Sequence, residues 1–93
     1  MVAVVARDLK QVSATGDVTT NVPAILRSVT LTAAAATSTV TVKDGSSGSA
    51  RLTLSAVANT SVVWNAGPSG VLFGTAIHAT LSGASAVASF EFD

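Results

Sequence analysis

Hydrophobic and polar residues alternate with a period of two along most of this chain. The alternation is clear over residues 38–44, where Val40 and Val42 point to one side and threonines to the other, and over residues 85–93. A period of two with one apolar face is typical of a half-buried antiparallel strand. Further windows of this kind cover residues 24–33, 50–56 and 75–82, with shorter segments at 9–13 and 18–22.

The window at 24–33 has apolar residues on both of its faces. Strict alternation places Ile25, Val29 and Leu31 on one face, together with Arg27. The same rule places Leu26 on the opposite face, among serine and threonine. We therefore expect Ile25 to point toward the core and Leu26 to point away from it.

Glycine-rich segments separate the windows. Residues 44–48 read as a hairpin loop, residues 67–70 as a second turn and Gly83 as part of a third, with glycine supplying positive φ. Residues 14–17 predict one more turn, and Pro23 marks the start or edge of a strand. The result is seven or eight short strands. This pattern predicts an all-β fold, either a small antiparallel β-sandwich or a jelly-roll-like barrel.

The length of 93 residues fits a single domain over residues 1–93. The apolar start at residues 1–6 ends at Arg7 and Asp8. It is shorter than the roughly 20 apolar residues of a spanning helix, and it lacks the basic region that opens a secretory signal. We interpret residues 1–8 as an extended N-terminal arm or a first strand, and we expect no membrane partner.

Charge is scarce and balanced in this sequence. Five Lys and Arg offset five Asp and Glu, so the formal net charge is zero, and the sequence has no cysteine. This composition disfavours a nucleic-acid partner, which needs a basic surface. The polar faces are Ser and Thr, which protect edge strands weakly against other chains. We expect a homo-oligomer, trimer or dimer; the alternative is a compact domain with no special partner.

Residues that could carry chemistry are few. His78 falls on the Ser/Thr face of its window, with no nucleophile motif to serve. Asp44 and Ser46 could offer oxygen ligands to calcium, but the loop has only this one carboxylate. We therefore expect no enzyme, no cofactor, no catalytic residue and no metal site.

Four residues are candidates for an interface. Val2, Val4 and Val5 could add a strand to a neighbouring chain through the N-terminal arm. Trp64 fits an interface anchor and a core residue equally well, because tryptophan is enriched at contact hot spots. Trp64 and Phe73 flank the second glycine-rich turn and could pair across a hairpin.

Several segments in the last two-thirds of the chain occur in a recognisable order. They are 28–32 (SVTLT), 38–48 (STVTVKDGSSG), 52–56 (LTLSA), 71–74 (VLFG), 81–83 (LSG) and 90–92 (FEF). The hairpin with an Asp-Gly-Ser-Ser loop, followed by a short strand ending in Leu-Ser-Ala, resembles small virion proteins of tailed bacteriophages.

This resemblance covers residues 28–93 and implies a β-sandwich on the capsid exterior. It implies a decoration or cement protein that binds the major capsid protein and stabilises the lattice through many contacts, or another small head or tail component. The alternative is a glycan- or receptor-binding module of a phage tail or adhesin. The resemblance carries no catalytic residues.

Overall fold

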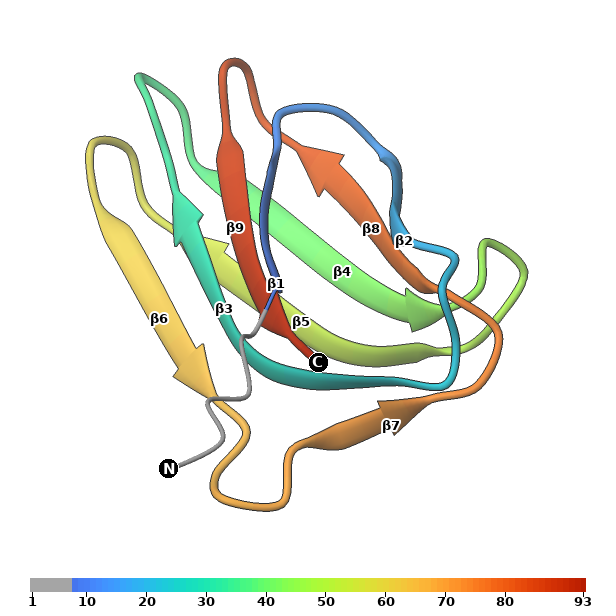
Figure 1. Ribbon diagram of the computed structural model, residues 1–93. Helices are drawn as coiled ribbons and strands as arrows, with labels where there is room; N and C mark the ends of the chain where they lie inside the picture. Colours follow the sequence, from blue (N-terminus) through green and yellow to red (C-terminus); the bar gives the residue numbers. More distant parts are fainter. Residues whose placement is uncertain (1–7) are drawn as a thin grey trace.

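Two antiparallel sheets face each other across a shared apolar layer (Figure 1). The computed structural model describes residues 8–93, which form strands joined by turns and loops, and none of these residues belongs to a membrane-crossing helix. The predicted all-β fold is confirmed. The nine strands of this part of the chain are β1 (Asp8–Val12), β2 (Gly16–Thr19), β3 (Ala24–Thr32), β4 (Ser38–Asp44), β5 (Ala50–Ala56), β6 (Ser61–Asn65), β7 (Val71–Phe73), β8 (Ile77–Ser82) and β9 (Val87–Phe92).

The strand order within the sheets is that of a jelly roll. Sheet A has the order β1-β9-β3-β6, with β7 also pairing β3, and sheet B has the order β2-β8-β4-β5. Four strand pairs are nested in the sequence. The pair β4–β5 lies within β3–β6, which lies within β2–β8, which lies within β1–β9, as in one long hairpin folded over two sheets. A jelly roll is built in this way, with β7 as an additional strand here.

The core lies between the inner faces of the two sheets. In β4, β5, β8 and β9 the inward side chains are those that alternation predicts. Burial of these side chains supplies most of the driving force for folding. The largest fully buried apolar side chains are Phe73, Phe90, Leu26, Leu31, Ile77, Val29, Val40 and Val42.

A register shift in β3 reverses the expected orientation of two residues. Pairing between β3 and β9 shifts between Leu26 and Ser28, so the alternation of side chains changes phase there. Leu26 is therefore buried, at 1% exposure, and Ile25 is only half-buried. The predicted orientations of Ile25 and Leu26 were wrong, because strict alternation takes no account of the extra residue at a bulge.

The predicted loop over residues 44–48 and the turn over residues 67–70 are both present, with φ of 87° at Gly45 and 84° at Gly67. The turn predicted over residues 14–17 is displaced, because Gly16 already belongs to β2. At the start of the described chain, Asp8 is the first residue of β1, and the rest of the predicted arm lies outside the described residues.

Candidate functional site

The structure describes one of the four predicted interface residues, Trp64. Val2, Val4 and Val5 lie outside the described residues. Trp64 lies on β6, an edge strand of sheet A, where it pairs with Val29 on the inward side. Its side chain is half-buried and packs against the core, so it contacts the core while part of it stays exposed at the edge.

Trp64 and Phe73 do not pair across a hairpin, and that prediction was wrong. β6 and β7 pair with successive parts of β3, at Ser28–Thr32 and at Ala24–Leu26. The two strands therefore lie one after the other along β3 (Figure 1). The sequence shows the turn between them but not which strand they share.

His78 lies on the outer face of sheet B, as alternation predicts. Its Nδ1 is 2.8 Å from Oδ1 of Asp17 on β2, and its backbone pairs with Lys43 on β4. The histidine side chain is 12% exposed and that of Asp17 is 44% exposed. The contact links β2 to β8 beside a register shift that follows Asp17.

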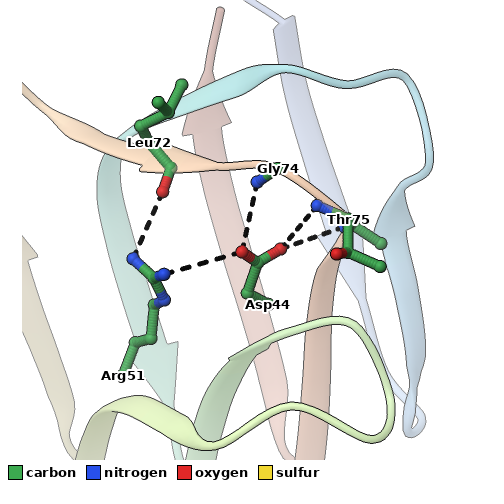
Figure 2. Close-up of polar contacts among 6 residues, drawn as sticks. Asp44, Arg51, Leu72, Gly74 and Thr75 are labelled. Carbon is green, nitrogen blue, oxygen red and sulfur yellow. Dashed lines mark hydrogen bonds and ion pairs between the residues drawn. The ribbon is translucent and has the colours of Figure 1, made fainter.

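Asp44, the last residue of β4, binds the segment that precedes β8 at one end of sheet B. Its Oδ1 accepts hydrogen bonds from the backbone N–H of Thr75 at 2.7 Å and of Ala76 at 3.2 Å. Its Oδ2 accepts one from the N–H of Gly74 at 3.2 Å (Figure 2). The bond from Thr75 is the main reason why the pKa of Asp44 is lowered, since hydrogen bonds to a carboxylate favour its charged form.

Arg51 ties the same region to β7. One guanidinium nitrogen lies 3.6 Å from Oδ2 of Asp44, and another donates to the carbonyl of Leu72 at 3.3 Å (Figure 2). The guanidinium also lies 5.4 Å from the ring centre of Phe73, within cation–π range. Together, Asp44, Arg51 and residues 74–76 form what we call the Asp44 clamp.

The clamp fastens the end of β4 to the segment that precedes β8. Both oxygens of Asp44 face N–H donors, whereas a calcium site surrounds the ion with oxygen ligands. Within residues 8–93 there is also no group of three or more His, Cys, Asp or Glu that could hold a metal ion. The sequence showed Asp44 as a turn residue and gave no signal for its partners about thirty positions away.

Open hollows lie on the surface of the described residues. Two neighbouring hollows share Thr20, Asn21 and Phe92, and Lys10 and Asp17 line one of them. Small-molecule sites are usually enclosed and mostly apolar, whereas these hollows are open and have more polar than apolar lining. These hollows are therefore weaker candidates for a functional site than the broad outer faces of the sheets.

The two outer faces differ in chemistry. On sheet A, three large apolar side chains point outward: Leu9 is 76% exposed, and Val63 and Leu72 are each 59% exposed. Among the described strands, these are the only large apolar side chains in the exposed class. Both outer faces also carry hydroxyl side chains: Ser28, Thr30, Thr32, Ser61 and Ser89 on sheet A, and Thr39, Thr41, Thr53, Ser55, Thr80 and Ser82 on sheet B. The faces therefore differ chiefly in the exposed apolar side chains of sheet A.

Comparisons with known proteins identify no relative of this chain. No family model, curated protein or solved structure matches it. The assignment of a site therefore depends on the geometry of the chain itself. On that geometry, the candidate functional site is the outer face of sheet A with its edge strand β6.

Proposed function

We propose that this protein is a structural virion component, a decoration or cement protein that binds the exterior of a capsid through the outer face of sheet A. The observation that carries the proposal is the exposure of Leu9, Val63 and Leu72 on that face. Apolar side chains exposed on strands gain free energy when a partner covers them. The partner is the major capsid protein, and the proposed role involves no catalytic step.

The opposite face suits contact with water. The outer face of sheet B combines Ser and Thr hydroxyls with Lys43, Arg51 and His78, and none of its described strands carries a large apolar side chain in the exposed class. A capsid presents many equivalent positions, so an interface of about 1,200–2,000 Å² per copy would stabilise the lattice at many positions.

Cosedimentation with the cognate capsid lacking this protein tests the proposal. We expect Leu9→Gln and Leu72→Gln each to weaken binding about tenfold, a loss of about 1.4 kcal/mol. Thr53→Gln, on the outer face of sheet B, is the matched control and should bind as the wild type does. Deleting residues 1–6, which removes Val2, Val4 and Val5, should also lower occupancy if the arm adds a strand to a neighbour.

Full occupancy by both leucine variants would contradict the proposal. Equal weakening by Thr53→Gln would contradict it as well, because the two faces would then be equivalent. Unchanged occupancy after deletion of residues 1–6 would remove the arm from the interface and leave the sheet A face in place.

The alternative function is a glycan- or receptor-binding module of a phage tail or adhesin. Jelly rolls occur in lectin domains as well as in capsids, and the half-buried Trp64 offers part of an aromatic ring at the β6 edge. This alternative predicts a glycan-array signal that Trp64→Ala removes. Binding to the capsid without any glycan signal would decide against it.

A further inference from the structure

The edge strands of the two sheets are not equally protected against pairing with another chain. On β1, Lys10 pairs with Phe90 on the inward side, and an inward-pointing lysine discourages edge pairing. β2 is four residues long and has a register shift beside Asp17. β5 carries Arg51 and pairs with β4 through a register shift. β6 differs from these three strands, because its sequence, Ser-Val-Val-Trp-Asn, contains no charge, proline or glycine and its register is regular.

The segment around β6 is uncharged over a long distance. No Lys, Arg, Asp or Glu occurs between Arg51 and Glu91. A second copy of this segment would therefore meet no like charge. Self-association is the pairing that such a neutral edge permits most readily, since every copy offers the same strand.

The backbone groups of β6 that face away from β3 can be identified from two hydrogen bonds. The N–H of Ala66 donates to the carbonyl of Arg27 at 2.9 Å. The carbonyl of Thr60 accepts from the N–H of Ala33 at 2.9 Å. Even-numbered residues therefore point their backbone groups toward β3, and odd-numbered residues point theirs toward the free edge. The residues whose N–H and C=O lie along the free edge are Ser61, Val63 and Asn65.

We infer that β6 pairs antiparallel with β6 of a second copy, about a two-fold axis through Val63. In this register Val63 lies opposite its own copy, and Ser61 lies opposite Asn65 of the second copy. These are the residues with outward backbone groups, so the three pairs form about six hydrogen bonds, two for each pair. A five-residue strand that is polar at both ends and apolar between them is complementary to itself in this orientation.

The side chains support the same register. Val62 lies opposite Trp64 of the second copy on the inward side, where both side chains are half-buried in one copy alone. Val63, which is 59% exposed, meets its own copy on the outer face. Pairs of apolar side chains opposite each other on adjacent strands stabilise a sheet by about 0.2–1 kcal/mol each.

Pairing in this way joins the two copies of sheet A into one continuous sheet. Its outer face carries two sets of Leu9 and Leu72, so the dimer presents the proposed capsid-binding face twice. The inference deepens the proposed function and rests on it for the biological use of the dimer. The pairing itself forms without a capsid, so it can be tested separately.

Cysteine crosslinking tests the register, because the chain has no cysteine of its own. We expect mild oxidation of Val63→Cys to give a covalent dimer of twice the mass of one chain, since Cα atoms of directly opposite residues are about 5.5 Å apart. Val57→Cys is the matched control, because Val57 is similarly exposed, at 64%, but lies outside β6, and it should not crosslink. A mixture of Ser61→Cys and Asn65→Cys should crosslink, whereas Ser61→Cys alone should not.

Sedimentation velocity without any capsid tests the association itself. The wild type should be a dimer, and Val63→Lys, which places like charges opposite each other, should weaken association at least tenfold. Thr53→Lys adds the same charge on β5 and should leave the dimer intact. A wild type that stays monomeric at every concentration would overturn the inference, as would crosslinking of Val57→Cys equal to that of Val63→Cys.

The outcomes separate this inference from the proposed function. A monomeric wild type that still binds capsids would overturn the pairing and leave the function standing. A β6 dimer that binds no capsid would overturn the proposed function and leave the pairing standing. A monomer whose Val63→Cys variant crosslinks to the capsid protein would assign the β6 edge to the capsid and overturn pairing with a second copy.

Discussion

The Asp44 clamp and the β6 edge use backbone polar groups in opposite ways. In the clamp, three consecutive N–H groups at residues 74–76 meet the carboxylate of Asp44 within the same chain. Along β6, the backbone groups of Ser61, Val63 and Asn65 face the side on which no strand of residues 8–93 pairs with it. The same chemical groups contribute to stability where the chain supplies their partner, and favour association where another chain must supply it.

The two aromatic residues of these regions show the same difference. Phe73 lies beneath the guanidinium of Arg51 and is 1% exposed, so its ring belongs to the folded core. Trp64 packs against the core from an edge strand and stays half-buried. The ring of Phe73 is therefore fully buried within one copy, whereas Trp64 on β6 keeps part of its side chain exposed.

The largest expected effect comes from truncating these two aromatic side chains. Phe73→Ala should lower the free energy of unfolding by about 3–5 kcal/mol, because it leaves a cavity in a fully buried layer. Trp64→Ala should lower it by less in the monomer, although its side chain is larger. Urea denaturation in the Val63→Lys background, at a concentration where that variant is expected to be monomeric, measures both losses. Equal losses would mean that Trp64 contributes as much as Phe73 to the stability of a single copy, which would contradict the comparison.

The next effect is the pH dependence of the clamp. The pKa of Asp44 is lowered in the folded protein, chiefly by the backbone hydrogen bond from Thr75. The folded state therefore binds this proton more weakly than the unfolded state does. The contribution of Asp44 is present above the unfolded pKa of about 3.9 and is lost as the pH falls through the folded value.

Asp44→Asn should be less stable than the wild type at pH 7, and the difference should shrink below about pH 4. Urea denaturation from pH 7 down to pH 3 measures both profiles, and the other carboxylates are common to the two proteins. Parallel profiles would show that Asp44 does not carry this pH dependence. The dimer formed through β6 should persist in Asp44→Asn at pH 7, since the clamp lies outside that edge.

The smallest effect should come from Arg51. Its side chain is 46% exposed, so the ion pair with Asp44 and the contact with Phe73 are both screened by water. We expect Arg51→Met to cost about 0.5–1 kcal/mol, measured by thermal unfolding. A loss as large as that of Phe73→Ala would mean that the arginine, and not the backbone N–H groups, holds the clamp together.

Much of the fold follows from local sequence. The windows at 38–44 and 50–56 coincide with β4 and β5, because the alternation of Val40 and Val42 with threonines is a property of neighbouring residues. Glycine at position 45 likewise ends a strand by its own backbone preference. No alternating window was predicted over residues 61–65, so the strand that carries Val63 and Trp64 was missed.

Other features depend on contacts between segments that lie far apart in the sequence. The bulge in β3 arises from its pairing with β9, so Leu26 rather than Ile25 entered the core. Asp44 accepts hydrogen bonds from N–H groups about thirty positions away, and β6 lies at an edge because, among the described strands, it pairs with β3 alone. Alternation along the chain determined which residues could be buried, but pairing between remote strands determined which of them had neighbours, because hydrogen bonding across a sheet does not depend on separation in sequence.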